Sequence, residues 1–273
     1  MKNIIILNKK EGETPLDALE NFRFKNKEYI NTPMTYAGRL DPMASGVLLI
    51  LAGEETKNKE KYLNLDKEYK FEVLFGFSTD TYDILGKVSP RPGLGEKLDK
   101  NELEKEIKIN IKNLIGESIQ KYPMYSSKTI KGKPLFIYAR SGEVVDIPER
   151  KIFIKKLKLI KIRKINSKKL LQNIEKRIKK VKGPAHNAKS IVFAGGDFRQ
   201  EEILKIWRKT LLKFPKDPVF GKRGEYFYIA SFKINCSSGT YVRVIADSLG
   251  KSINIPALAF SIKRTKVGKY VIR

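Results

Sequence analysis

Two stretches of alternating apolar side chains constrain the fold of this chain more than any other feature. In residues 67–77, and again in residues 226–236, apolar side chains stand at every second position. A period of two places alternate side chains on opposite faces of a strand, so each stretch predicts a strand with one buried face. Such strands need partners, and 273 residues are enough to bury a core around a sheet.

Amphipathic helices are predicted between the strands. One covers about residues 100–115, where Asp99 and Glu102 have the spacing of a capping box. Another begins after Asp197 and carries Trp207 on its apolar face. We interpret Trp207 as a packing residue rather than a platform on which a base stacks, because it shares that face with aliphatic side chains.

The charge of the chain indicates a polyanionic partner. Lys and Arg number 56 against 30 acidic residues, a formal net charge of +26. Such a field attracts nucleic acid, which we predict as the partner. Residues 151–182 are the most basic part, with fourteen Lys or Arg and one acidic residue. This run has two open interpretations, a solvated face or an RNA contact.

Several classes of chemistry are disfavoured by what the sequence lacks. Cys236 is the only cysteine and His186 the only histidine. An intrachain disulfide and a thiolate zinc cluster are therefore excluded, and catalysis by a Ser-His-Asp triad is disfavoured. The chemistry must use carboxylate, tyrosine, arginine or lysine side chains. Neither a signal peptide nor a membrane span is predicted, so we expect a soluble cytoplasmic protein.

A single carboxylate stands out at residues 36–46, YAGRLDPMASG, after a predicted loop over 31–41. Asp41 lies between Gly38 and Pro42 in a rigid turn. An arbitrary Asp-Pro pair more often caps a helix that starts at the proline. The neighbouring Gly-Arg-Leu, the apolar run that follows and a distant segment with a lone arginine favour the other interpretation, a reactive acid.

Five segments together resemble the tRNA pseudouridine synthase B family, also called TruB. They occur in the family's order and with approximately its spacing, apart from one insertion. The segments are NKKEG at 8–12, GRLDPMASGVLLILAGEETK at 38–57, LDKEYKFEVLFGFSTDTYD at 65–83, YSSKTIKGKPLFIYARSGEVV at 125–145 and CSSGTYVRVIADSLG at 236–250.

The resemblance implies both a fold and a reaction. The implied fold is α+β, with a large mixed, mainly antiparallel sheet and flanking helices around a central RNA-binding cleft. The implied enzyme is an isomerase that converts uridine-55 in the T-loop of tRNA to pseudouridine. It breaks the bond from C1′ to uracil N1, turns the base and joins C1′ to C5. This reaction needs no cofactor and no metal.

The resemblance also assigns three catalytic residues. Asp41 is the expected nucleophile, which attacks either the ribose C1′ or the uracil C6. Arg243 is expected to pair with Asp41 and hold it ionised. Tyr69 is expected to stack on the target base and assist removal of the C5 proton. From pattern alone Tyr69 is also consistent with a core tyrosine.

Further residues are expected to bind the substrate. Tyr241 and Ile262 match positions that line the uracil pocket. Tyr36 replaces a histidine usual in the family and is expected to stack in the space that the flipped base vacates. The full set of substrate-binding candidates is Tyr241, Ile262, Tyr36, Lys9, Lys128 and Arg264.

The expected organisation is one catalytic domain over residues 1–273. A basic insertion subdomain, atypical of the family, is predicted at 165–225, with a loop rich in Gly, Pro and Asn at 183–196. The family's C-terminal RNA-binding PUA domain is expected to be absent. The partner is expected to be the T-arm of tRNA, and the protein a monomer. Two alternatives stay open, a tRNA-folding chaperone without essential catalysis and a guide-dependent synthase acting on ribosomal RNA.

Overall fold

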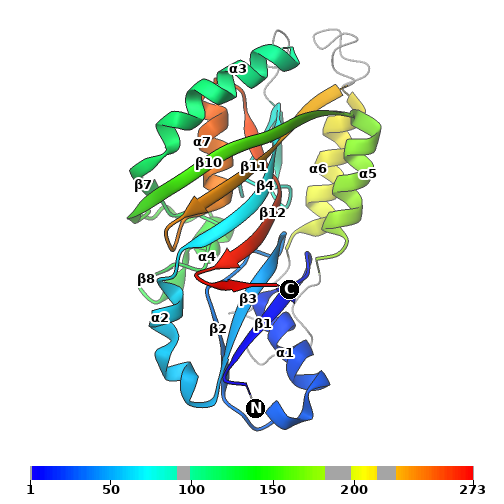
Figure 1. The fold of residues 1–273 in the computed structure, drawn as a ribbon. Coiled ribbons are helices and arrows are strands. Elements are labelled where there is room, and N and C mark those ends of the chain that lie inside the picture. The colour runs from blue at the N-terminus through cyan, green and yellow to red at the C-terminus, as the bar shows by residue number, and fades with distance from the viewer. Residues whose placement is uncertain (1, 91–98, 182–197, 214–225, 273) are drawn as a thin grey trace.

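The computed structural model describes residues 2–90, 99–181, 198–213 and 226–272. Within this part a nine-stranded sheet forms the centre of the molecule (Figure 1). Its strands are β1 Ile4–Lys9, β2 Met34–Ala37, β3 Ala44–Ala52, β4 Lys67–Phe75, β7 Gly116–Lys121, β10 Glu149–Asn166, β11 Tyr226–Cys236, β12 Ala257–Val267 and β13 Tyr270–Val271. Two small hairpins pair β5 Phe77–Thr79 with β6 Val88–Pro90, and β8 Thr129–Ile130 with β9 Lys133–Pro134.

Helices lie against both faces of this sheet and around its ends. They are α1 Pro15–Lys25, α2 Lys59–Leu63, α3 Lys100–Asn110, α4 Leu135–Ser141, α5 Ser167–Ile178, α6 Gln200–Lys213 and α7 Val242–Ser252. Three short 3-10 helices are η1 Lys27–Tyr29, η2 Gly53–Asn58 and η3 Ile111–Leu114. The α+β class and the mixed sheet predicted above are confirmed.

The strand order is β1-β3-β12-β4-β11-β10-β7, with β2 paired to β3 and β13 to β12. Among the described ladders only β12 with β3 is parallel, and the others are antiparallel. In that parallel pair Ile262 lies opposite Ala44 and Arg264 opposite Gly46. Strand β12 therefore lies directly beside the segment that follows Asp41.

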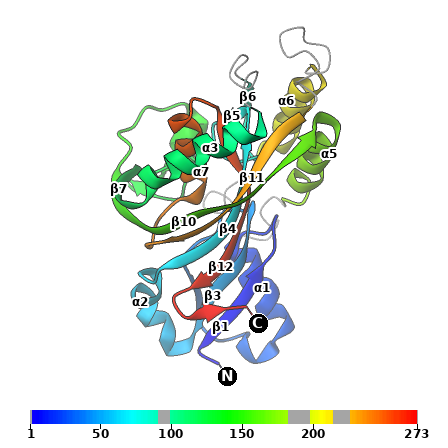
Figure 2. The same cartoon turned by 45° about the horizontal axis from the view of Figure 1, so that its top comes forward.

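The two faces of the sheet carry separate apolar clusters. On one face Phe71 and Phe232 stack at 5.2 Å between ring centroids and pack beneath α3 and α7. On the other face Leu74 and Phe260 pack beneath α5 and α6. Figure 2 shows α3 and α7 on one side of the long strands and the α5–α6 pair on the other. Because both faces are covered, the middle of the sheet is shielded from water on both sides.

Most of the local predictions are confirmed. Asp99 caps α3, and Glu102 completes the capping box. The alternating stretch 67–77 is a strand, but it ends at Phe75, and β5 begins at Phe77. The loop predicted at 31–41 contains the short strand β2. The loop predicted at 183–196 and the predicted cap Asp197 lie outside the described residues.

The alternation of 226–236 is interrupted at its beginning. Tyr226, predicted on the same side as the buried residues, is 52% exposed, whereas Phe227 and Ile229 on the opposite side are buried. The physical reason is the second layer, since the α5–α6 pair covers this end of β11 and buries the face that the pattern assigned to solvent. The sequence shows the period of the strand but not what covers each face.

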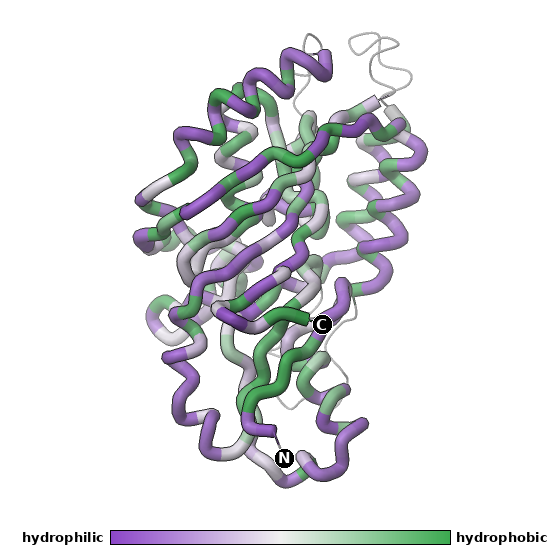
Figure 3. The backbone as a smooth tube through the Cα atoms, in the orientation of Figure 1, coloured by the Kyte–Doolittle hydropathy of each residue, from purple (hydrophilic) through white to green (hydrophobic). Residues whose placement is uncertain are grey.

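Trp207 of α6 is fully buried, as predicted for a packing residue. Its ring lies 5.5 Å from Phe77, and its indole N–H donates to the carbonyl of Ile84 at 3.1 Å. The described part of the predicted insertion is therefore continuous with the core. Figure 3 shows that α5 and α6 alternate between hydrophobic and hydrophilic residues, whereas most of β3 and the first part of β1 are hydrophobic. None of the helices described is both apolar enough and long enough to cross a bilayer.

Neighbouring leucines on α6 test whether this helix is part of the core. Leu211 is 2% exposed, whereas Leu212 is 64% exposed. We expect Leu211→Ala to lower the free energy of unfolding by about 2–5 kcal/mol, because it leaves a cavity. Leu212→Ala is the matched control and should change it by less than about 0.5 kcal/mol. Urea unfolding followed by circular dichroism measures both, and equal effects would contradict the packing of α6 on the sheet.

Candidate active site

Asp41 lies in a turn between β2 and β3 that backbone hydrogen bonds hold in place. Its carbonyl accepts a hydrogen bond from Ala44 N at 2.9 Å, and the carbonyl of Pro42 accepts one from Gly12 N at 2.8 Å. The second bond ties the turn to the loop after β1, which explains why the NKKEG segment belongs with the Asp41 motif. The side chain of Asp41 keeps 35% of its surface exposed, so its carboxylate is accessible from the cleft.

Arg264 supports the same turn through hydrogen bonds to backbone carbonyls. Its side chain is 1% exposed. The guanidinium donates to the carbonyls of Val47 at 2.7 Å, Gly38 at 3.1 Å and Arg39 at 3.2 Å. The backbone of Gly46 approaches so closely that a Cβ there would lie 2.1 Å from the Arg264 carbonyl oxygen, so only glycine fits. Arg264 borders the cleft, but its donors are directed into the protein.

Lys9 supports the loop that contacts this turn. Its side chain is fully buried, and its ammonium donates to the carbonyls of Lys10 at 3.0 Å and Glu13 at 2.6 Å. Burial lowers the pKa of Lys9 to about 8, although nearby carboxylates oppose that shift. The same loop packs tightly on the end of α5, because a Cβ at Gly12 would lie 2.4 Å from the Lys180 carbonyl oxygen. In this structure Lys9 therefore holds a loop and does not face the cleft.

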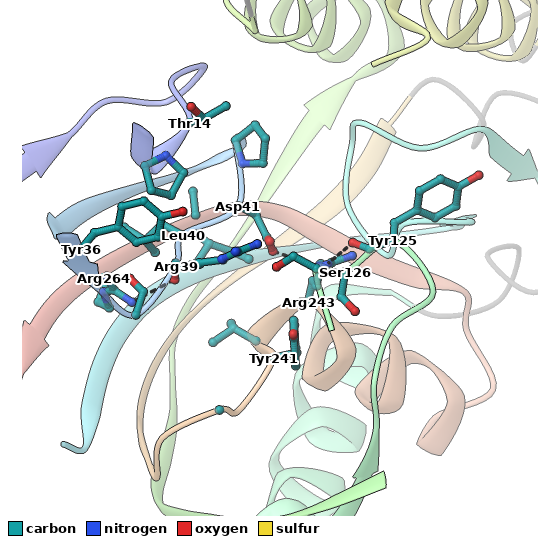
Figure 4. Close-up of a pocket in the computed structure, with 18 of the residues that line it drawn as sticks. Thr14, Tyr36, Arg39, Leu40, Asp41, Tyr125, Ser126, Tyr241, Arg243 and Arg264 are labelled. Atoms are coloured by element: carbon teal, nitrogen blue, oxygen red, sulfur yellow. Dashed lines mark hydrogen bonds and ion pairs between the residues drawn. The ribbon is translucent and has the colours of Figure 1, made fainter. Parts of the chain in front are cut away.

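The predicted pair of Asp41 and Arg243 is present. The Nε of Arg243 donates to Oδ2 of Asp41 at 2.9 Å (Figure 4). The two other nitrogens of the guanidinium donate at 2.8 Å to the carbonyls of Thr81 and Tyr125. Arg243 is only 2% exposed, and each of its three guanidinium nitrogens donates a hydrogen bond to an acceptor within the protein. This arrangement fixes the position of one carboxylate oxygen.

A second carboxylate, Asp83, lies behind Arg243. It is 6% exposed and accepts hydrogen bonds from the Thr81 hydroxyl at 2.7 Å and from Leu85 N at 2.9 Å. Burial raises the pKa of Asp83 to about 6, while the charge of Arg243 lowers it and that of Asp41 raises it. The site therefore contains two acids with different surroundings, one open to the cleft and one enclosed.

Tyr241 lies on the opposite side of the cleft, at the start of α7. Its backbone is bound on both sides by the Gln120 amide, which accepts from Tyr241 N at 2.8 Å and donates to its carbonyl at 3.3 Å. The ring meets Tyr122 edge to face at 5.8 Å, and the Arg243 guanidinium lies 5.6 Å from its centroid. Burial raises the pKa of the Tyr241 hydroxyl. The Tyr241 side chain is thus held in place at the border of the cleft, with its phenol neutral.

These residues border one cleft of about 1130 Å³. Tyr69 projects from β4 and is 8% exposed, and Ile262 projects from β12. Burial raises the pKa of the Tyr69 hydroxyl. Tyr36 borders the cleft from β2, with the Lys59 ammonium 5.8 Å from its ring. The cleft combines apolar walls with the accessible carboxylate of Asp41, an arrangement that can hold a planar base beside a nucleophile.

The structure brings together most of the residues predicted for the site. The following predicted residues border the cleft: Asp41, Tyr69, Arg243, Tyr241, Ile262, Tyr36 and Arg264. Lys9 and Lys128 are not among the lining residues. The Lys128 ammonium instead lies 5.3 Å from the ring of Tyr122, and its carbonyl accepts from Leu135 N at 2.8 Å.

Sequence reasoning missed several residues that the structure places here. Asp83 is the last residue of the LDKEYKFEVLFGFSTDTYD segment. This segment was recognised in the sequence, but Asp83 was assigned no role. Gln120 lies outside every recognised segment and carried no signal. Arg39 and Arg150 also line the cleft, and a Cβ at Gly239 would collide with the Arg150 guanidinium, which stacks on that turn.

The enclosed position of Asp83 predicts a pH dependence. Its ordinary pKa is 3.8 and its folded pKa is about 6, so the stability it contributes is present below about pH 4 and lost as the pH rises through about 6. The unfolding free energy of the unmodified protein, minus that of Asp83→Asn, should fall by up to about 3 kcal/mol from pH 4 to pH 7, since one pKa unit is about 1.4 kcal/mol.

Denaturant titrations at several pH values measure this difference. Asp146→Asn, at an exposed position, is the control and should give a difference that does not change with pH in this way. A difference that rises with pH would contradict the enclosed, proton-binding state of Asp83. It would instead show that the ionised carboxylate is held by Arg243.

Comparison with known proteins identifies the family of this chain. The chain is 29% identical over 272 residues to the tRNA pseudouridine synthase B of Ligilactobacillus salivarius, covering 100% of this chain and 69% of the relative. It is 40% identical over 156 residues to the protein of the same name from Caldanaerobacter subterraneus subsp. tengcongensis, covering 56% of this chain and 51% of the relative.

Solved structures share the fold. A chain in the crystal structure of a Cbf5-Nop10-Gar1 complex superposes with a TM-score of 0.53 at 15% identity, over 99% of this chain but only 50% of the longer one. The family model described as TruB family pseudouridylate synthase (N terminal domain) matches residues 27–184, more than half of the chain. The chain therefore belongs to the TruB family of pseudouridylate synthases.

Proposed function

We propose that this protein isomerises uridine-55 in the T-loop of tRNA to pseudouridine, with Asp41 as the nucleophile. The observation that carries the proposal is the accessible Asp41 carboxylate, which Arg243 fixes at 2.9 Å in a cleft with aromatic and apolar walls. The names of the relatives, tRNA pseudouridine synthase B, support tRNA as the substrate.

In this proposal the two oxygens of Asp41 have different tasks. Oδ2 is held by Arg243, and Oδ1 attacks the nucleoside at C1′ or at C6. In the C1′ route the C1′–N1 bond breaks as the ester forms, and the uracil turns within the cleft. C5 then attacks C1′ and releases the carboxylate, N1 takes up a proton, and C5 loses its own. The ion pair keeps a charged donor on Oδ2 when the substrate excludes water.

The walls of the cleft keep the detached base in place. Tyr69 is the expected stacking surface for the base. Because burial raises the pKa of Tyr69, its phenol is neutral at neutral pH. We therefore assign it a hydroxyl relay for the C5 proton rather than a phenolate base. Tyr241 and Ile262 confine the base from other sides, and Tyr36 is positioned to stack where the base has left the T-loop.

The net charge of +26 suits the T-arm of tRNA, where phosphates provide most of the affinity. Extruding the target nucleotide costs a few kcal/mol, which contacts to the phosphates offset. We propose a monomeric enzyme that acts in the cytoplasm. The sole cysteine, Cys236, is a buried free thiol and is compatible with a reducing compartment.

Replacing Asp41 should abolish the reaction and leave tRNA binding in place. We expect Asp41→Asn to reduce tritium release from a tRNA transcript labelled at C5 of uridine by at least about 10⁴-fold, because the nucleophile is removed. Filter binding should show an affinity within about threefold of the unmodified protein, since the rest of the cleft is preserved.

A transcript that carries cytidine at the target position is the substrate control and should release no tritium with the unmodified protein. Tight, salt-sensitive binding without any release would contradict the proposal and favour a tRNA-folding chaperone. Release only in the presence of a guide RNA and a ribosomal RNA fragment would favour the guide-dependent alternative.

The basic surface of α5 is proposed to contact tRNA. Because α5 and α6 supply core residues, deleting the segment would uncover the sheet, and point substitutions test the idea better. Exchanging the exposed residues Lys169, Lys176 and Lys179 for Gln should weaken tRNA binding and reduce the slope of log affinity against log salt by about 2. Binding isotherms at four salt concentrations measure the slope.

The matched control exchanges three exposed lysines of α3 and η3, Lys105, Lys108 and Lys112, for Gln. Both triple variants lose the same net charge. If the two slopes decrease equally, the α5 surface has no special contact and the prediction is wrong. The single-turnover rate at saturating tRNA should be unchanged in both, because neither set borders the cleft.

A further inference from the structure

Helix α6 is attached to the loop that positions Arg243. Trp207 donates its indole N–H to the carbonyl of Ile84 at 3.1 Å, and Glu202 forms an ion pair with Lys87 at 2.7 Å. The loop from Thr79 to Lys87 therefore has the active site on one side and α6 on the other. This contact matters for the site because Thr81, in the same loop, supplies one of the carbonyls that hold Arg243.

Arg199, immediately before α6, reaches the border of the cleft. Its guanidinium forms an ion pair with Asp80 at 3.1 Å and lies 4.7 Å from the centroid of the Tyr125 ring. Its backbone is in the left-handed region, with φ of 54°, and its carbonyl accepts from Ile203 N at 2.9 Å in the first turn of α6. A non-glycine residue in this region is uncommon and costs conformational energy, so the surrounding contacts hold it there.

Asp80 and Tyr125 belong to the two segments that hold the guanidinium of Arg243. The carbonyl next to Asp80, that of Thr81, accepts from Nη1, and the carbonyl of Tyr125 itself accepts from Nη2. Burial and the nearby Asp80 carboxylate raise the pKa of the Tyr125 hydroxyl. Arg199 thus contacts both segments: it forms an ion pair with Asp80 and lies over the ring of Tyr125.

We propose that Arg199 is a positioning residue for the catalytic pair: it clamps the loop of Asp80 to the segment of Tyr125, so that both carbonyls keep Arg243 aligned with Asp41. This inference rests on the proposed function. It assigns a catalytic support role to a segment, 165–225, that the sequence identified as a basic insertion. Arg199 acts through Arg243 and does not touch the reacting atoms.

The physical reason is the burial of Arg243. A guanidinium that is 2% exposed loses water as an alternative partner, so each of its acceptors must stay in place. If the Thr81 and Tyr125 segments separate, the guanidinium follows one of them and the Asp41 carboxylate turns with it. A displacement of about 1 Å at reacting groups lowers rates by about 10²-fold.

The obvious alternative is that Arg199 contacts a phosphate of the RNA. Its side chain is 20% exposed, and its guanidinium is already bound to the Asp80 carboxylate, which is 32% exposed. An arginine that serves as a phosphate contact would be expected to present its donors to solvent. The two roles differ in what they predict, because a lost phosphate contact lowers affinity and salt dependence, whereas a lost clamp lowers the rate of the bound complex.

The test measures single-turnover tritium release at saturating tRNA, together with tRNA affinity. We expect Arg199→Ala to lower the single-turnover rate by about tenfold or more, with an affinity change below about threefold. Arg199→Lys keeps the charge beside Asp80 and should recover most of the rate. Lys205→Ala, an exposed site on the same helix, is the matched control and should leave both quantities unchanged.

A double variant identifies the partner. If Arg199 acts through Asp80, then Asp80→Asn combined with Arg199→Ala should be no slower than Arg199→Ala alone. Fully additive losses would overturn the clamp. Unchanged rates with a weaker affinity would overturn it in favour of a phosphate contact, and unchanged rates and affinity would overturn it outright.

Hydrogen–deuterium exchange on the free protein gives a readout that does not depend on activity. Arg199→Ala should accelerate exchange of amides in residues 80–87 and 122–128, and Lys205→Ala should not. If the unmodified protein releases no tritium, the proposed function fails, and the exchange experiment still decides whether Arg199 joins the two segments. Unchanged exchange in both segments would overturn the clamp.

Discussion

The buried guanidinium of Arg243 is the constraint on which the site depends. A charge with 2% of its surface exposed is tolerated only when its donors are satisfied, and three separate parts of the chain satisfy them: Asp41, Thr81 and Tyr125. These acceptors come from three of the segments that define the family resemblance, and Arg243 comes from a fourth. The requirement to satisfy one buried charge explains why segments so distant in sequence must converge.

The two acids near Arg243, Asp41 and Asp83, lie in different environments. Asp41 is bound at one oxygen and open to the cleft, whereas Asp83 is enclosed and has a raised pKa. Two carboxylates near one guanidinium repel each other, and enclosing one of them favours its protonated form. With a pKa of about 6, Asp83 is protonated in mild acid and mostly ionised at neutral pH, where both carboxylates share the positive charge of Arg243.

The sequence predicted local features well and long-range support poorly. The α3 capping box, the strand at 67–77 and the packing role of Trp207 depend on neighbours within a few residues or on one periodic face. The pair of Asp41 and Arg243 was predicted only through the resemblance. In β11 the apolar Phe227 and Ile229 stand on the face that the alternation assigned to solvent, but a strand pattern does not identify the helices that cover it.

Basic residues near the acid illustrate the same limit. Lys9 and Arg264 were predicted to bind substrate, yet both are buried and donate to backbone carbonyls of the loops around Asp41. Spacing in a motif shows that a cation is required, but not whether it faces the ligand or the backbone. The difference is decided by burial, which depends on residues far away in the sequence.

The α5–α6 pair shows how a segment outside the recognised motifs can support catalysis. At the end of α5, Arg177 binds Glu11 through two nitrogens, with contacts of 2.7–3.1 Å, next to the glycine that holds the Asp41 turn. At the start of α6, Arg199 binds Asp80 beside a carbonyl that holds Arg243. The pair therefore touches the supports of both catalytic partners. Because the same helices bury core side chains, their packing and their electrostatic contacts are separable only by substitutions that change charge and preserve the core.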